Sequence, residues 1–289
     1  MKVSAFSIIR NALVYGYPVV EAITSVLPLC DEFIVNVGRS DDETLELVRG
    51  IDSPKIRIIE REWDMTLRTG GQLLSIQTNH ALEACTGDWC FYIQADEVLH
   101  EKYISVVQSA MSQYLANKRI DGLQFGYKHF YGSYDYYQDN FRTWYVKETR
   151  VIRRRPEIVS WGDGMDFRYR DGSPIRSKRI KGEIYHYGWV RSPETMIRKN
   201  TALSALYYTD EEIQRQLAMI QKPYDDLGHL KRFTEPHPRV MEARIAASIL
   251  NFDPKIDQQH PDWLRHLLLF LQPLTKRVKS LIRKLDTVQ

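Results

Sequence analysis

Residues 88–100 read Asp-Trp-Cys-Phe-Tyr-Ile-Gln-Ala-Asp-Glu-Val-Leu-His, an apolar run that ends on two carboxylates, Asp96 and Glu97. The run from 89 to 93 is typical of a buried strand. Open α/β sheets bind their ligands at the carboxyl ends of the strands. Carboxylate oxygens at that edge suit a hard divalent cation that holds a diphosphate. The alternative is a strand end followed by an ordinary acidic helix cap.

The segments around this stretch alternate between strand and helix patterns. Strands are expected at 3–9, 33–37, 56–59 and 89–93, and helices at 18–27, from 40 onward and at 72–85. This order predicts an α/β fold with an open, mostly parallel sheet and helices on both faces. Further along we expect a helix at 102–117, a strand at 122–130, an edge strand at 151–155, a loop-like stretch at 156–182 and a short strand at 183–187.

Composition narrows the class of protein. The 289 residues are 43% hydrophobic and 27% charged, which favours a folded core over disorder. A net charge of +3 argues against a dedicated nucleic-acid binder. The three cysteines form no metal or disulfide pattern. No apolar run approaches the ~20 residues of a membrane span, and the chain opens almost directly on a strand, so we expect a cytoplasmic protein.

The sequence predicts two regions. Residues 1–190 form a nucleotide-binding and catalytic domain, with a nucleotide half at about 1–100 and an acceptor half at about 101–190. Residues 191–289 form a mainly helical C-terminal region that ends in a basic amphipathic tail at 263–286. The leucine stripe of this tail has three open interpretations: it packs on the same chain, pairs with a second copy, or lies peripherally on the inner face of a membrane.

Several segments resemble family-2 glycosyltransferases of the GT-A fold. They are Phe6–Asn11, Ser25–Val35, Gly38–Thr44, Asn79–Trp89 and Gln94–Glu97, with a weaker likeness at Tyr185–Gly188. The likeness covers about the first 100 residues. It implies transfer of a sugar from a UDP- or GDP-linked nucleotide donor, assisted by Mg²⁺ or Mn²⁺ and with inversion, to an unknown glycan, lipid-linked or protein acceptor.

The resemblance also implies roles for individual residues. The expected metal ligands are Asp96, Glu97 and His186. The expected nucleotide-binding residues are Arg10, Asn11, Gly38, Asp42, Gly71, Gln94 and Ala95. Two positions depart from the family pattern, because Gln94 replaces the first acid of the metal motif and Val37 stands where an aspartate often contacts the nucleoside. For Asp42 a second interpretation has equal weight: its charge would cap the N-terminus of a helix and would not contact the nucleotide.

An inverting transfer needs a carboxylate that takes the proton of the acceptor hydroxyl. The candidates are Asp163 and Asp166, which lie beside a tryptophan in a glycine-containing segment, with Glu183 as a third option. We favour Asp163. Both acids have the alternative interpretation of turn formers.

Two further features have open interpretations. The aromatic residues between 127 and 145 either line an acceptor groove or belong to the core. The three arginines at 153–155 either face an acidic acceptor or decorate a solvated strand edge.

Two other functions remain open. A sugar nucleotidyltransferase shares the architecture, but it usually carries a glycine-rich basic signature after the first strand, which residues 11–16 lack. A non-catalytic module that binds nucleotide sugars would account for Gln94 and Val37.

Overall fold

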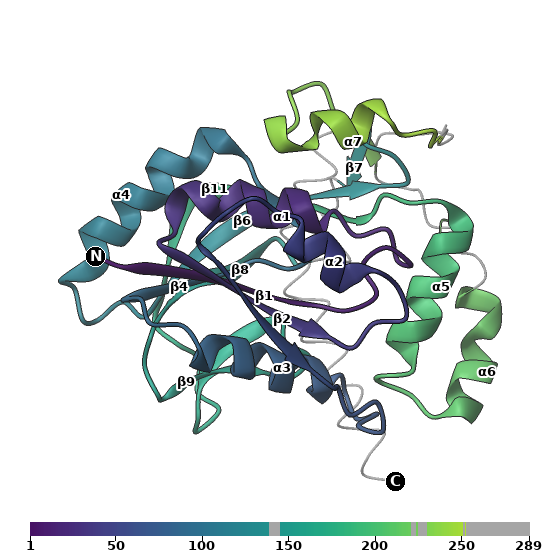
Figure 1. Cartoon of the computed structure of the whole chain (residues 1–289), viewed down its shortest axis with the longest axis horizontal. Helices are drawn as coiled ribbons and strands as arrows, with labels where there is room; N and C mark the ends of the chain where they lie inside the picture. The colour runs from purple at the N-terminus through teal and green to yellow at the C-terminus, as the bar shows by residue number, and fades with distance from the viewer. Residues whose placement is uncertain (139–144, 221–223, 225–229, 251, 253–289) are drawn as a thin grey trace, which may run out of the picture.

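The computed structural model describes residues 1–138, 145–220, 224, 230–250 and 252 (Figure 1). The strands are β1 (Val3–Ile9), β2 (Glu32–Gly38), β3 (Ile56–Arg61), β4 (Trp89–Tyr92), β5 (Glu97–Leu99), β6 (Gly122–Tyr131), β7 (Tyr136–Gln138), β8 (Lys147–Arg153), β9 (Ile158–Trp161), β10 (Asp166–Tyr169), β11 (Ser177–Trp189) and β12 (Leu230–Arg232). The α-helices are α1 (Val19–Val26), α2 (Thr44–Arg49), α3 (Gln72–Glu83), α4 (Ile104–Leu115), α5 (Pro193–Ser204), α6 (Asp210–Ile220) and α7 (Glu242–Ala246). Short 3₁₀ turns lie at Leu27–Leu29, Glu101–Tyr103 and Arg239–Met241.

A mixed sheet forms the centre of the molecule. Its strand order is β12-β7-β6-β8-β4-β1-β2-β3, and β11 pairs with both β6 and β5. The four strands β3, β2, β1 and β4 are parallel to one another, as the alternating pattern predicts. Antiparallel pairs of β8 with β4 and with β6 extend this unit.

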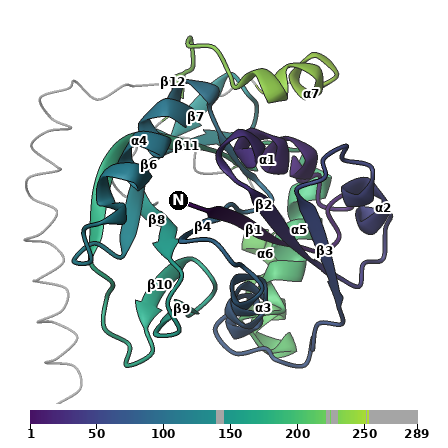
Figure 2. The same ribbon diagram turned by 60° about the vertical axis from the view of Figure 1, so that its left-hand side comes forward.

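Side chains of β1 alternate between two apolar clusters, one on each face of the sheet. Ala5 belongs to the cluster that includes Ile23 of α1 and Met111 of α4. Phe6 belongs to the cluster that includes Ala81 of α3. Figure 2 shows α1 and α4 on one side of these strands and α3 on the other. The α/β class with helices on both faces is therefore confirmed.

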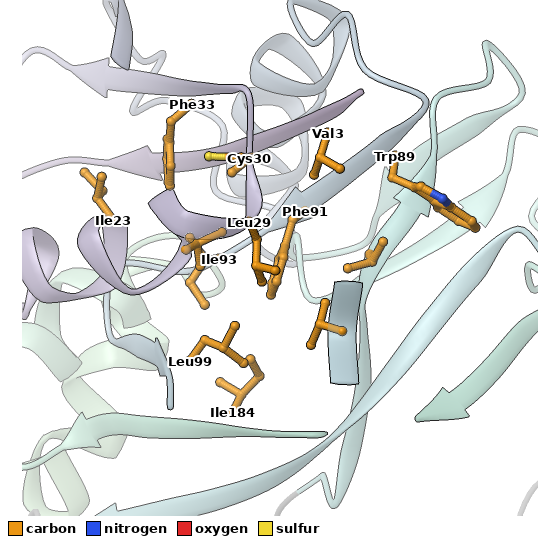
Figure 3. Packing of buried hydrophobic residues seen from close by; sticks show 14 of the residues in the cluster. Val3, Ile23, Leu29, Cys30, Phe33, Trp89, Phe91, Ile93, Leu99 and Ile184 are labelled. Carbon is orange, nitrogen blue, oxygen red and sulfur yellow. The ribbon is translucent and has the colours of Figure 1, made fainter. Parts of the chain in front are cut away.

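The cluster beneath α1 holds the parallel strands and the acidic turn together. Figure 3 shows Phe33 of β2 and Phe91 of β4 among its side chains, with Ile93 and Leu99 on either side of the turn that contains the two acids. All four side chains are at most 1% exposed. The turn between β4 and β5 is thus anchored at both ends by burial, which fixes where its polar side chains lie.

The structure corrects the expectation of an edge strand at 151–155. β8 lies inside the sheet, between β4 and β6. Arg153 is buried over the Trp89 ring, and its guanidinium donates to the carbonyl oxygens of Leu115, Asn117 and Ile120 at 3.0, 3.1 and 2.7 Å. It therefore satisfies carbonyls at the C-terminal end of α4, which ordinary helix termini leave without partners. The three consecutive arginines indicated a solvent-exposed strand edge. The first of them, Arg153, is instead buried and caps the C-terminal end of α4.

The stretch at 156–182, expected to be loop-like, contains the antiparallel pair β9 and β10. Within the aromatic segment, Phe130 is buried against Tyr187 and Phe233, so it belongs to the core. Tyr145 instead lines the cavity described below.

From residue 191 onward the described chain is mainly helical, with α5, α6 and α7 and the short strand β12. The boundary at 190 stays a prediction. The tail at 263–286 lies outside the described residues, so its three interpretations stay open. Among the helices that the structure describes, none has the length and apolarity needed to cross a bilayer.

Replacement of Arg153 by methionine should lower the free energy of unfolding by about 2–4 kcal/mol, because the carbonyls that it satisfies would lose their donor. Chemical denaturation measures this. The matched control is Arg49→Met, since Arg49 lies half exposed in a surface ion pair and should cost less than about 1 kcal/mol. Equal small losses in both variants would contradict the capping role.

Candidate active site

A cavity of about 450 Å³ opens at the carboxyl ends of β1 and β4. Its wall includes the end of β1 with Arg10, the turn with Gln94, Ala95 and Asp96, and α5 with Lys199 and Leu203. His186 of β11 and Asp163 of the loop between β9 and β10 also line it. This is the edge of a parallel sheet at which α/β folds bind ligands.

The two consecutive acids of the turn point to different partners. Glu97 is fully buried, and its two carboxylate oxygens accept from Nε and Nη2 of Arg150 at 2.9 Å each. The Tyr127 hydroxyl donates to Glu97 Oε1 at 2.7 Å, and the backbone N–H of Gln94 donates to Oε2 at 3.1 Å. Glu97 therefore holds the turn to the sheet, and both of its oxygens are occupied by these donors, so it does not fit the expected role of metal ligand.

Asp96 faces the cavity and is only 8% exposed. Its Oδ2 lies 3.2 Å from Nζ of Lys199 and 3.7 Å from Nε2 of His186. Burial would raise the pKa of the Asp96 carboxyl, but Lys199, and after it His186, hold that pKa well below its usual range. Burial lowers the pKa of Lys199 to about 8, with Arg191 acting in the same direction. The site thus pairs a carboxylate with a buried ammonium.

A histidine pair lies behind Asp96. The Nδ1 atoms of His129 and His186 are 2.9 Å apart, and Nε2 of His129 lies 2.8 Å from the carbonyl oxygen of Tyr145. A carbonyl oxygen can only accept, so Nε2 of His129 carries the proton. Burial, together with His186, lowers the pKa of His129 to about 3, which leaves it neutral. Its Nδ1 therefore accepts from His186, and this bond fixes the His186 ring towards Asp96.

Gly188 allows this close arrangement. A Cβ atom at that position would stand 2.6 Å from Cε1 of His186 and 2.8 Å from Oδ2 of Asp96. The Tyr185–Gly188 segment, only weakly similar to the family at the sequence level, thus supplies both a ring that faces Asp96 and the space that it needs.

These residues do not fit a divalent-cation site. Within the described ranges, no group of three His, Cys, Asp or Glu residues is placed to hold a metal ion. Glu97 is committed to Arg150, and Gln94 is neutral. Oδ2 of Asp96, the oxygen that faces His186, is already in contact with the Lys199 ammonium. The positive charge of this lysine would repel a second cation at the same oxygen.

The expected nucleotide-binding residues fall into two groups. Arg10, Gln94 and Ala95 line the cavity. Asn11, Gly38 and Asp42 lie outside its wall and organise the neighbouring loops. Asn11 donates to Asp41 at 2.9 Å, and Gly38 is covered by the indole of Trp63.

Asp42 accepts from the backbone N–H groups of Val14 and Thr44 at 2.8 and 3.0 Å. The contact with Thr44, the first residue of α2, agrees with the interpretation of Asp42 as a helix-capping charge. Gly71, at the start of α3, has a positive φ of 70° and packs directly against Asp163 and Tyr207.

The structure also separates the two candidate bases. Asp163 lines the cavity, and its Oδ2 accepts from the Tyr207 hydroxyl at 3.1 Å. Asp166 lies outside the wall, pairs with Arg168 at 3.3 Å, and has a side chain that is 43% exposed. Of the two, only Asp163 is positioned to meet a ligand in this cavity.

Comparison with known families decides the assignment. The model of the family described as "Glycosyl transferase family 2" matches residues 17–181, more than half of the chain. The chain belongs to glycosyl transferase family 2. No curated protein matches it.

Several solved structures are similar to this chain at a low level. TarS of S. aureus is 16% identical over 75% of this chain and 42% of that chain, with a TM-score of 0.40. TarS 1–349 in complex with UDP-GlcNAc is 14% identical over 77% and 72% of the two chains, with a TM-score of 0.42. Glucosyl-3-phosphoglycerate synthase from Mycobacterium tuberculosis, with Mn²⁺, UDP-Glc and phosphoglyceric acid, is 22% identical over 44% of each chain, with a TM-score of 0.32. The chain thus spans less than half the length of the first and third of these.

Two residues of the cavity wall, Lys199 and Trp63, and one residue outside it, Glu148, had no signal in the sequence. Lys199 lies on α5, beyond the stretch matched by the family model. Trp63 lines the cavity, and its indole Nε1 is buried without a hydrogen-bond partner among the described residues. Glu148 of β8 has a pKa that burial raises to about 7; Arg150 opposes the shift, and Asp166 adds to it. The surroundings of each of these three side chains are formed by residues that are distant in the chain.

Removal of one charge of the Glu97–Arg150 pair should destabilise the protein strongly. Glu97→Gln leaves a buried guanidinium without its anion, so the free energy of unfolding should fall by about 3–5 kcal/mol. The control Glu60→Gln breaks an ion pair whose two side chains are more than half exposed and should change it by less than about 1 kcal/mol. A loss in Glu97→Gln as small as that of the control would contradict the anchoring role.

The pKa of Glu148 predicts a pH dependence of stability. Because the folded state raises this pKa from 4.5 to about 7, the protonated carboxyl is stabilising at low pH, and this contribution is lost as the pH rises through about 7. The wild type should therefore lose about 1–3 kcal/mol relative to Glu148→Gln between pH values of about 4 and 8. Denaturant titrations across that range measure it, and a pH-independent difference would refute the assignment.

Proposed function

We propose that this chain transfers a sugar from a nucleoside-diphosphate donor, UDP- or GDP-linked, to an acceptor hydroxyl with inversion at the anomeric carbon. The observation that carries the proposal is a single cavity, at the carboxyl edge of the parallel strands, whose wall combines a buried cation, Lys199, with a separate carboxylate, Asp163. A diphosphate leaving group needs a positive charge to stabilise it. An acceptor hydroxyl needs a carboxylate that takes its proton.

Inverting transfer is one displacement. The acceptor oxygen forms a bond to the anomeric carbon, the bond from that carbon to the diphosphate oxygen breaks, and its electron pair leaves with the diphosphate. Asp163 takes the hydroxyl proton, oriented by the hydrogen bond from Tyr207. Deprotonation by a positioned carboxylate contributes about 10²–10⁴-fold to such reactions.

Aromatic side chains give the cavity the surfaces that a nucleoside and a sugar require. Trp63, Tyr15 and Tyr145 lie in the wall, and their faces can stack on a base or a sugar ring. The buried indole N–H of Trp63 supplies a donor for a carbonyl oxygen on a base edge. The acceptor class, whether glycan, lipid-linked molecule or protein, stays open.

In this reaction no divalent cation is needed to stabilise the leaving diphosphate. Metal assistance is the expectation that comes from the family resemblance, and Asp96 with His186 would have to carry it alone. The contact between Asp96 and Lys199 supports a different source of positive charge, the lysine itself.

A screen of nucleotide sugars for slow hydrolysis or transfer tests the proposal. With the best donor, Asp163→Asn should lower kcat by about 100-fold or more while the KM of the donor changes little, because the residue acts on the acceptor proton. Asp166→Asn is the matched control, since its side chain lies outside the cavity, and it should stay within a few-fold of wild type.

Three outcomes would count against this account. Loss of kcat in Asp166→Asn alone would refute the choice of base. Binding of donors without turnover of any would favour the non-catalytic module. Release of pyrophosphate from a sugar phosphate and a nucleoside triphosphate would favour a nucleotidyltransferase.

A further inference from the structure

The side of the cavity that Lys199 lines has an excess of buried positive charge. Lys199 and Arg191 are 7% and 4% exposed. Their charged groups lie over the Tyr17 ring, at 5.3 and 5.1 Å from its centroid. Among the described residues, Asp96 is the one carboxylate in contact with either of them. Two cations thus share one anion in a site largely withdrawn from water, an arrangement that is costly unless a further anion joins it.

The hydrogen-bond donors of these cations are only partly used. Lys199 donates to Oδ2 of Asp96 at 3.2 Å and to the carbonyl oxygen of Gly188 at 2.8 Å, which leaves one of its three N–H groups for the cavity that it lines. Arg191 donates through Nη1 to the same carbonyl. Its Nε and Nη2 are buried and have no hydrogen-bond partner among the described residues.

Asp96 restrains Lys199 within the cavity wall. The carboxylate holds the ammonium from the turn between β4 and β5, and the carbonyl of Gly188 holds it from the end of β11. Helix α5 supplies the side chain, and this helix begins at a proline with the Ser192 hydroxyl as its cap. Three separate elements therefore fix one ammonium at the carboxyl edge of the sheet.

We propose that Lys199 binds the diphosphate of the donor directly and stabilises it as the leaving group, with Arg191 adding positive potential from behind, so that transfer does not depend on a divalent cation. This inference rests on the proposed function, since it names the group that acts on the leaving diphosphate. Asp96 is then a positioning residue for the lysine. As the bond between sugar and diphosphate breaks, the electron pair moves to the leaving oxygen, and the fixed ammonium stabilises the charge that develops there.

Binding in the presence of a chelator tests the inference on the intact protein. Isothermal titration with UDP and with GDP, each in EDTA and in Mn²⁺, should show that the preferred diphosphate binds the wild type with dissociation constants that agree within about threefold. The bare nucleoside should bind more weakly and equally in both conditions.

Lys199→Met removes the charge but keeps most of the side-chain volume. It should weaken diphosphate binding by about 10- to 100-fold, the loss typical of a charge-assisted hydrogen bond, and leave binding of the nucleoside unchanged. The matched control is Lys178→Met, which alters an exposed lysine on β11 and should bind as the wild type does. Lys199→Arg should retain part of the preference for the diphosphate.

A second variant protects the test against misfolding, because Lys199→Met leaves the Asp96 carboxylate without its main partner. Asp96→Asn combined with Lys199→Met removes both charges and should show the same loss of diphosphate binding with a wild-type circular dichroism spectrum. The chelator experiment needs no variant.

The failures of the two proposals are distinguishable. Diphosphate binding that requires Mn²⁺, with no effect of Lys199→Met, would overturn the role of the lysine and leave the transferase function standing. An absence of nucleoside-diphosphate binding in every condition, together with no turnover of any nucleotide sugar, would overturn the function itself.

Discussion

The bidentate ion pair between Glu97 and Arg150 is the interaction on which the site depends. It is fully buried, and it joins the turn after β4 to a strand more than fifty residues later in the chain. Glu97 is the first residue of β5 and is held in the sheet, whereas Asp96, in the turn just before it, faces the cavity. The two neighbouring acids thus have different contacts: Glu97 anchors the turn to Arg150, and Asp96 contacts Lys199.

The Asp96 carboxylate therefore lies in a site that is poor in water, and its charge is neutralised by Lys199 of α5. A metal ion would supply two positive charges, but it would need several oxygen or nitrogen donors with free lone pairs. This chain has replaced one acid of the motif by Gln94, committed the second to Arg150, and brought a covalently attached cation to Asp96. The charge that a leaving diphosphate needs is thereby part of the polypeptide.

Much of the fold could be predicted from the sequence, because the strands of the parallel half are short apolar runs closed by turn signals. The prediction failed where a charge is buried. Arg153 was interpreted as part of a solvated edge, whereas it caps α4 from inside the sheet. The position of the cavity could also be predicted, since the turn that contains Asp96 follows a buried strand. The partners of its two acids could not, because Arg150 and Lys199 reach the turn only through tertiary packing.

The central claim is that the Lys199 ammonium, and not a metal ion, contacts the diphosphate. A crystal structure of the wild type soaked with Mn²⁺ and the preferred nucleoside diphosphate, with data recorded at the manganese edge, tests this directly. The account predicts a diphosphate oxygen within hydrogen-bond distance of Lys199 Nζ and no anomalous peak beside Asp96. A manganese ion bound by Asp96 and His186, with Lys199 displaced, would contradict it.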